Sequence, residues 1–212
     1  MKTLIAIPCM STVPWEFSKS MDYLVKGENV SILYKPNSLV YDSRNLISLT
    51  AIENNFDRVM WFDSDIVFQP DTLQILHHDM TFHHCGMVTG LYVKRYFPTE
   101  PVIYQKLEEP ERDTTGRLIK QIEAFHDYPH DEVFPVRGCG FGCVLTSVDV
   151  LKDVWDHFGP AFTPYPWAGE DISFCHRVNK LGHRILCDPA VSCGHVGNYI
   201  YTEQDLKRGE KH

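Results

Sequence analysis

The sequence predicts an α/β fold in which a mixed, mainly parallel central sheet is flanked by helices. Over residues 3–90, short apolar segments alternate with longer amphipathic segments, which is typical of strands joined by helices. Turn-forming residues, such as Gly27 and the segment 35–38, separate these elements. The chain has 212 residues without a repeat, a low-complexity segment or a clear linker, so we expect a single domain.

The first half of the chain supplies the parallel part of this sheet. Strands are expected at residues 4–7, 30–34 and 58–62. Helices are expected at residues 14–25, 41–52 and 70–80. Ligands of such sheets bind beyond the carboxyl ends of the strands. Pro8, Cys9 and the segment Asp63–Asp65 follow two of these strands, so we expect them to face one cleft.

The second half has a different pattern, with shorter strands and more turns. Strands are expected at residues 87–92, 102–104, 118–125, 133–136, 144–145 and 185–186. The charged segment 108–116 predicts a surface hairpin or a mobile loop. Helices are expected from Ser147 to Phe158 and from Gly169 to Leu181. The alternate glycines at 138, 140 and 142 predict a strand with one empty face, where a backbone or a ligand comes close.

Composition and charge narrow the function. The net charge of −8 argues against nucleic acid as the main partner, because phosphate binding needs a basic face. No apolar run approaches the length of a membrane span. Residues 1–8 carry one basic residue and a four-residue apolar run before Pro8, which predicts a strand rather than a signal peptide. Without a secretion signal, we expect the seven cysteines to be reduced thiols in a cytoplasmic protein.

The segment from Val59 to Phe68 carries the clearest chemical signal. Apolar residues run directly into Asp63-Ser64-Asp65, and apolar residues follow. Two carboxylates one residue apart repel each other unless a cation lies between them or they face different partners. Mg²⁺ or Mn²⁺, with oxygen ligands and a phosphate as co-ligand, would remove that cost. The alternative is an Asx turn that caps the helix expected after Pro70.

Three further positions have both a chemical and a plain interpretation. Glu170-Asp171 is either an acidic pair favoured by a helix dipole or contains a desolvated general base next to the aromatic segment 165–167. His195 is either structural or a third metal ligand, which Mn²⁺ would accept. Arg44 lies either on an exposed helix face or against a phosphate or carboxylate.

The remaining cysteines and histidines do not form a zinc motif. None has the paired spacing of known zinc sites, so reduced or buried cysteines and surface histidines are the preferred interpretation. The segments concerned are Cys139 and Cys143, Cys175-His176, and the cluster His77-His78 with His83-His84-Cys85.

Together, these segments resemble nucleotide-sugar glycosyltransferases of the GT-A type, in the broad family 2-like group. The resemblance covers roughly residues 3–198, and the compact length is similar to small phage or prophage-type members. It rests on five features in order: Ile5-Ala6-Ile7-Pro8, Ser43-Arg44-Asn45, Trp61-Phe62-Asp63-Ser64-Asp65 with Pro70, Gly140-Phe141-Gly142-Cys143, and Gly169-Glu170-Asp171 with Gly194-His195.

The resemblance implies a GT-A (Rossmann-like) domain over residues 1–198. Its nucleotide-binding half would be residues 1–90 and its acceptor-binding half residues 91–198, followed by a C-terminal tail at 199–212. The donor would be a nucleoside diphosphate sugar, with Mn²⁺ or Mg²⁺ bridging its two phosphates. The acceptor would be a hydroxyl of a glycan, small molecule or protein.

The resemblance also implies roles for individual residues. Asp65 would bind the metal, with His195 completing the site, and Asp63 would touch the ribose or reach the metal through water. The donor site would also include Pro8 and Cys9 beside the nucleoside, Arg44 in the nucleotide pocket, and Ser64 between the two carboxylates. Asp171 would be the general base toward the acceptor hydroxyl, and Glu170 would orient acceptor or donor.

Several alternatives remain open at the level of the sequence. The second strand ends in Leu33-Tyr34-Lys35-Pro36, without the Asp that many family 2 members place there for the base, so uridine is only the default. Asp171 suggests inversion, although retaining GT-A enzymes share the same metal layout. A haloacid-dehalogenase-like phosphohydrolase with Asp63 as nucleophile is the alternative enzyme. A sugar-binding protein without catalysis is a third hypothesis.

Overall fold

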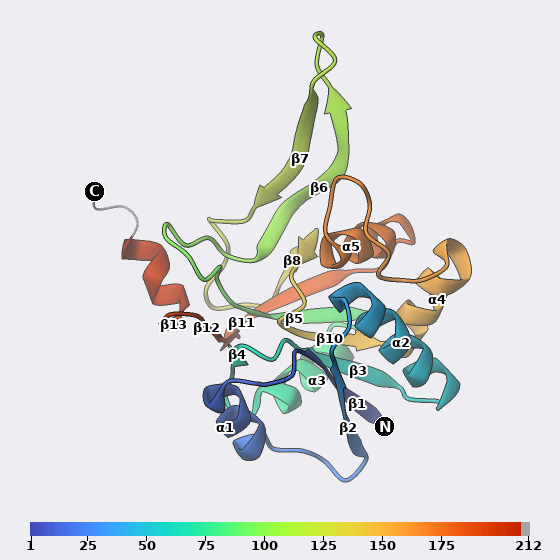
Figure 1. Ribbon diagram of the computed structural model, residues 1–212, viewed down its shortest axis with the longest axis vertical. Coiled ribbons are helices and arrows are strands. Elements are labelled where there is room, and N and C mark those ends of the chain that lie inside the picture. The colour runs from blue at the N-terminus through green and yellow to red at the C-terminus, as the bar shows by residue number, and fades with distance from the viewer. Residues whose placement is uncertain (209–212) are drawn as a thin grey trace.

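The computed structural model describes residues 1–208, and within them a seven-stranded mixed sheet forms the centre of the molecule (Figure 1). Its strand order is β2-β1-β3-β10-β5-β11-β8. Strands β1, β2, β3, β5 and β11 run in one direction, whereas β10 and β8 run in the opposite one. The bounds are β1 Thr3–Cys9, β2 Val30–Pro36, β3 Arg58–Phe62, β5 Met87–Leu91, β8 Phe134–Val136, β10 Cys143–Ser147 and β11 Ile185–Ser192. The predicted mixed, mainly parallel sheet is confirmed.

Helices cover both faces of this sheet. Helices α2, α4 and α5 pack together on one face, and α1 and α3 lie on the other. Alternate residues of β3 divide between these layers, with Trp61 facing α2 and α4 and Phe62 facing α1 and α3. The bounds are α1 Trp15–Tyr23, α2 Val40–Glu53, α3 Thr72–Phe82, α4 Val148–Phe158 and α5 Glu170–Lys180.

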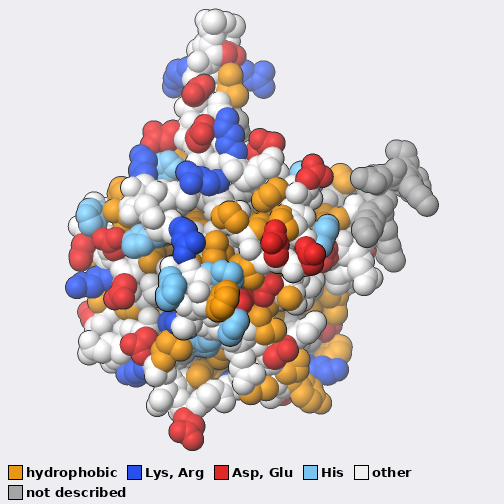
Figure 2. All heavy atoms as spheres, turned by 180° about the vertical axis from the view of Figure 1, so that it is seen from behind, with side chains coloured by type: hydrophobic (Ala, Val, Ile, Leu, Met, Phe, Trp, Pro, Cys, Tyr) orange, Lys and Arg blue, Asp and Glu red, His pale blue; other side chains and the backbone are white. Residues whose placement is uncertain are grey.

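Two smaller sheets extend the molecule. One contains β4 (Ile66–Val67), β12 (Gly194–Val196) and β13 (Ile200–Tyr201), followed by the 3₁₀ helix η1 (Glu203–Arg208). The other contains β6 (Ile103–Arg112), β7 (Leu118–Ala124) and β9 (Gly138–Cys139). The β6–β7 hairpin projects away from the body (Figure 1), and Figure 2 shows basic and acidic side chains interspersed along it. Residues 209–212, the end of the expected C-terminal tail, lie outside the described residues.

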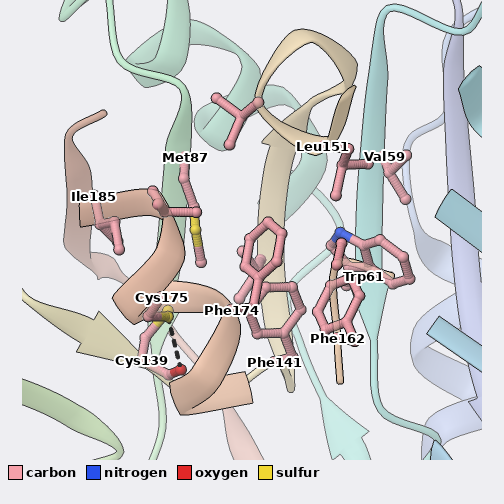
Figure 3. Packing of buried hydrophobic residues seen from close by; sticks show 14 of the residues in the cluster. Val59, Trp61, Met87, Cys139, Phe141, Leu151, Phe162, Phe174, Cys175 and Ile185 are labelled. Carbon is pink, nitrogen blue, oxygen red and sulfur yellow. Dashed lines mark hydrogen bonds between the residues drawn. The ribbon is translucent and has the colours of Figure 1, made fainter. Parts of the chain in front are cut away.

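Aromatic rings fill the core between the sheet and α5 (Figure 3). Phe162 and Phe174 stack with ring centroids 4.5 Å apart, and Phe141 meets both edge-on. Trp61 packs against Phe141 and Phe162, so this cluster links β3 to the segment before α5. Burying such rings stabilises the fold by about 1.5–3 kcal/mol each. The cluster therefore fixes α5 relative to the end of β3.

Most expected elements are present, and three expectations need correction. The strand expected at residues 102–104 is the first part of β6, which runs to Arg112 and makes the segment 108–116 a hairpin. The strand expected at 185–186 continues to Ser192. An Asx cap on α3 is wrong, because Asp63-Ser64-Asp65 precedes β4 and the side chain at the N-cap of α3, Asp71, makes no capping hydrogen bond.

The glycine-rich segment before β10 accommodates a side chain rather than a ligand. The buried ring of Tyr92 lies over it, and the Gly142 backbone N–H donates to Tyr92 Oη at 3.1 Å. A Cβ at Gly140 would lie 2.0 Å from Tyr92 Oη. The strand predicted across the alternate glycines is therefore wrong at residues 140–142, which lie between β9 and β10, and the close neighbour is the side chain of Tyr92, directly after β5, rather than a backbone or a ligand.

The cysteines and helices show two further features. All seven cysteines fall within the described residues and are free, with only Cys9 partly exposed. Among residues 1–208, no helix combines the length and apolar character needed to cross a membrane.

Candidate functional site

One cavity of about 520 Å³ collects every residue that the sequence singled out for the site. It lies at the carboxyl ends of β1, β2 and β3, where ligands of open α/β sheets bind. Its predicted lining residues are Pro8, Cys9, Arg44, Asp63, Ser64, Asp65, Glu170, Asp171 and His195. It is also lined by Met10, Ser38, Leu39, Val40 and Arg95, which were not in the predicted site.

Backbone pairing brings Asp65 and His195 together across 130 residues of chain. Strand β12 pairs with β4, which places His195 opposite Ile66, and the Val196 backbone N–H donates to the Asp65 carbonyl oxygen at 2.8 Å. The His195 Nε2 atom then lies 3.5 Å from Asp65 Oδ2. Two side chains that are distant in sequence are thus held by main-chain hydrogen bonds rather than by loops.

The orientation of His195 suits a side chain that binds a cation. Its Nδ1 atom lies 2.9 Å from the Val93 carbonyl oxygen, which can only accept, so Nδ1 carries the proton. In the neutral ring, the lone pair of Nε2 therefore faces the Asp65 carboxylate. Burial raises the pKa of Asp65, but His195 and then Arg95 outweigh it, and the pKa lies below its ordinary value. When the ring is neutral, Nε2 and Asp65 Oδ2 are two acceptors that face each other, and a proton or a cation between them relieves this arrangement.

Arg44 joins two other carboxylates of the cavity, Asp63 and Glu170. Its Nη2 donates to Asp63 Oδ1 at 2.7 Å and its Nη1 to Glu170 Oε1 at 2.5 Å. The guanidinium is buried and lies over the rings of Phe141 and Phe162. Burial lowers the pKa of Arg44, but Asp63 and Glu170 more than offset this. The exposed-face interpretation of Arg44 is therefore wrong, and it binds carboxylates.

Among the carboxylates of the cavity, Asp171 has a raised pKa. It lies partly buried in the first turn of α5, and its Oδ1 accepts from the Ile172 backbone N–H at 2.7 Å. Burial is the main cause that raises the pKa of Asp171 to about 6, with Arg44 opposing the rise and Glu170 adding to it. A carboxylate with this pKa is ionised near neutral pH and still basic enough to accept a proton.

The charges of the cavity point to a cationic ligand. Four carboxylates (Asp63, Asp65, Glu170 and Asp171) face two guanidinium groups (Arg44 and Arg95). An anionic ligand such as a diphosphate would be repelled by the surplus of negative charge unless a cation accompanied it.

The residues present fit a divalent cation that is completed by its substrate. Within the described residues, no group of three or more His, Cys, Asp and Glu side chains is arranged as a self-sufficient metal site. Asp65 and His195 could supply two ligands, and Asp63 is held by Arg44. Mg²⁺-type sites commonly use one or two protein ligands and take the rest from substrate phosphates and water. The donor set therefore fits Mn²⁺ or Mg²⁺ bound together with a phosphate-containing ligand.

Five lining residues, Met10 among them, were not part of the predicted site, although the sequence left Arg95 open between an exposed position and contact with a phosphate or carboxylate. Ser38, Leu39 and Val40 enter the cavity because they join β2 to α2, and their position after a strand is the signal that identifies such residues. Arg95 donates from Nη1 to Asp65 Oδ2 at 2.5 Å. Its sequence context, a loop between strands, left its partner open.

Comparison with known proteins yields structural matches alone. No family model matches the chain, and no curated protein sequence does either. Among solved structures, A197 from STIV is similar with a TM-score of 0.65 and 20% identity over 93% of this chain and 86% of that chain. GalNAc-T7, solved with UDP, GalNAc and Mn²⁺, has a TM-score of 0.60 and 8% identity over 92% of this chain. S. aureus TarS 1–349 has a TM-score of 0.52 and 14% identity over 89% of this chain.

The chain has the GT-A glycosyltransferase fold. It spans 43% of the GalNAc-T7 chain and 58% of the TarS chain, but 86% of A197. In this GT-A fold, the segment Asp63–Asp65 follows the third strand, β3, of the central sheet.

Proposed function

We propose that this chain is a metal-dependent glycosyltransferase that moves a sugar from a nucleoside diphosphate sugar to an acceptor hydroxyl with inversion. A family 2-like assignment and a UDP-sugar donor are part of this proposal. The observation that carries it is the facing pair of acceptors, Asp65 Oδ2 and His195 Nε2, 3.5 Å apart in an acidic cavity of a GT-A fold. This pair is suited to a divalent cation that arrives with a diphosphate.

Each part of the cavity has a task in this proposal. The segment Pro8–Cys9 borders the nucleoside, and Ser64 lies between the two carboxylates that face the ribose and the cation. Asp65 and His195 would hold Mn²⁺ or Mg²⁺, which when bound stabilises the negative charge of the leaving diphosphate. Asp63, fixed by Arg44, presents its second oxygen toward the cavity as an acceptor for a ribose hydroxyl or a bound water.

Asp171 performs the proton transfer. Its carboxylate takes the proton of the acceptor hydroxyl as that oxygen bonds to the anomeric carbon of the donor, and the bond from that carbon to the diphosphate breaks. A single displacement of this kind inverts the anomeric configuration. Glu170, which is held in place by Arg44, keeps the first turn of α5 oriented. Its carboxylate can accept a hydrogen bond from a hydroxyl of the donor sugar or of the acceptor molecule.

The alternative phosphohydrolase finds no supporting feature. An Asp63 nucleophile would be held through Oδ1 by the buried guanidinium of Arg44, which leaves only Oδ2 for attack. The fold is also that of GT-A proteins.

The direct test is release of nucleoside diphosphate from a panel of nucleotide sugars in the presence of Mn²⁺. We expect release to be lost with a chelator and with Asp65→Ala, because the cation then has no carboxylate ligand. Asp71→Ala is the matched control, since Asp71 is exposed and its side chain makes no cap hydrogen bond. Release that survives both chelation and Asp65→Ala would refute the proposal. Hydrolysis of simple phosphate esters that is lost with Asp63→Asn would favour the phosphohydrolase.

A further inference from the structure

Arg95 reaches the cavity from a loop with a fixed base. We define the 94–100 loop as the residues between β5 and β6 that are closed by the Val93–Pro101 bridge. At its base, the Lys94 backbone N–H donates to the Glu100 carbonyl oxygen at 2.9 Å, and the two side chains form an ion pair at 2.5 Å. The loop backbone is therefore held at both ends.

The far side of this loop is held by aromatic contacts. Phe97 stacks on Tyr199 with ring centroids 6.0 Å apart and also contacts Tyr201 of β13 at 5.5 Å. These contacts connect the loop to the segment that follows β12, the strand that carries His195. The side chain of Arg95 thus extends from a backbone that is anchored on both sides of the loop.

The guanidinium of Arg95 occupies the position on Asp65 where a divalent metal ion would bind. Its Nη1 donates to Asp65 Oδ2, the same oxygen that faces His195 Nε2, and lies 3.5 Å from the Val196 carbonyl oxygen. A divalent ion held by Asp65 and His195 and the Arg95 guanidinium would compete for this one oxygen. Both cannot bind it at full strength.

The two arginines of the cavity differ in how readily they can be displaced. The side chain of Arg95 is 54% exposed, whereas that of Arg44 is 3% exposed between its two carboxylates. The Arg95–Asp65 pair, in which the Asp65 side chain is 25% exposed, therefore contributes less to stability than the pairs of the buried Arg44, because the Arg95 charge remains solvated. Arg95 can therefore leave Asp65 at small cost, and its planar fork is suited to phosphate oxygens.

We propose that Arg95 is a displaceable internal cation that neutralises Asp65 in the metal-free chain and, when a divalent cation binds, moves to the diphosphate of the donor. This inference rests on the proposed function and adds a role for a residue outside the predicted site. Its consequence is that the same side chain opposes binding of the metal alone and favours binding of the metal together with the diphosphate.

Two binding measurements separate these effects. Mn²⁺ affinity without nucleotide is measured from the electron paramagnetic resonance signal of free Mn²⁺, and UDP affinity at saturating Mn²⁺ by calorimetry. For Arg95→Ala we expect Mn²⁺ alone to bind roughly threefold or more tightly, because the competitor is gone. We expect UDP to bind roughly tenfold more weakly, because a charge-assisted phosphate contact is lost. For Arg95→Lys, Mn²⁺ affinity should stay near that of the unchanged chain.

The controls distinguish failure of this inference from failure of the proposed function. Arg117→Ala removes an exposed arginine of the β6–β7 hairpin and should change neither affinity. If Asp65→Ala abolishes Mn²⁺ binding while Arg95→Ala leaves both affinities unchanged or weakens both, only the role of Arg95 is refuted. If the unchanged chain binds no Mn²⁺ with or without UDP, the metal-dependent function is refuted as well.

Discussion

Replacing Asp171 with Asn should stabilise the protein at neutral pH. Burial, with Glu170 adding to it and Arg44 opposing it, raises the pKa of Asp171 from 3.8 to about 6. A difference of this size corresponds to about 3 kcal/mol of unfavourable free energy for the ionised form in the folded chain. Asn keeps the oxygen that accepts from the Ile172 backbone N–H and removes the charge. The α5 dipole favours that charge by about 0.3–1 kcal/mol, so the net gain is about 2–3 kcal/mol.

The pH dependence of this gain has a definite sign. Because the pKa of Asp171 is higher in the folded chain than in the unfolded chain, the folded chain binds more protons, and stability falls as the pH rises from about 4 to about 6. The gain in free energy of unfolding from Asp171→Asn should therefore be absent below about pH 4, about 1.5 kcal/mol at pH 5 and full above about pH 7. These values apply before the contribution of the helix dipole is subtracted.

Urea unfolding at pH 5 and pH 8, followed by circular dichroism, measures this difference. The matched control is Asp149→Asn, since Asp149 occupies the first turn of α4 but is exposed. It should lose about 0.3–1 kcal/mol through the dipole at both pH values. A loss of stability in Asp171→Asn at pH 8, or a gain that is equal at both pH values, would show that Asp171 is not a desolvated carboxylate.

Three further predictions follow from the same cavity and its supporting core. Arg44→Met should lower the free energy of unfolding by about 2–4 kcal/mol in urea titrations, because Glu170 and Asp63 lose their partner. The loss is smaller than for a fully buried pair, because the Asp63 side chain is 33% exposed. The pH profile of kcat/KM should rise through about pH 6 as Asp171 loses its proton, and Asp171→Asn should lose this rise; a profile unchanged by Asp171→Asn would assign the base elsewhere. Gly140→Ala should lower the melting temperature and destabilise the fold by about 1–3 kcal/mol, because its Cβ would overlap Tyr92 Oη, whereas Gly27→Ala has open space around it and should be neutral.

The fold and the part of the cavity at the strand ends were predictable from the sequence, because both depend on local pattern. Alternation of apolar and amphipathic segments placed β1, β2 and β3 in a mainly parallel sheet, and the residues after these strands define the cleft. The first turn of α5 was found in the same way, from Gly169 followed by an acidic pair.

The partners of the charged residues were not predictable, because they depend on contacts across the chain. Arg44 lies 126 residues from Glu170, and no local pattern distinguishes a buried guanidinium from an exposed one. The contact of Arg95 with Asp65 and the ring of Tyr92 over the alternate glycines likewise join separate segments. The length of β6 was underestimated, since its outer residues 108–112 are polar on both faces and lack alternation.

Arg44 has a mechanical consequence for how a substrate can enter. It bonds the end of β3 through Asp63 to the start of α5 through Glu170, and the stacked rings of Phe162 and Phe174 lie beside it. The end of β3 and the start of α5, which form two walls of the cleft, are therefore held at a fixed separation by these two ion pairs. A ligand that enters this cavity would therefore meet a wall of fixed width, and selection at this wall would depend on the shape of the ligand rather than on closure around it.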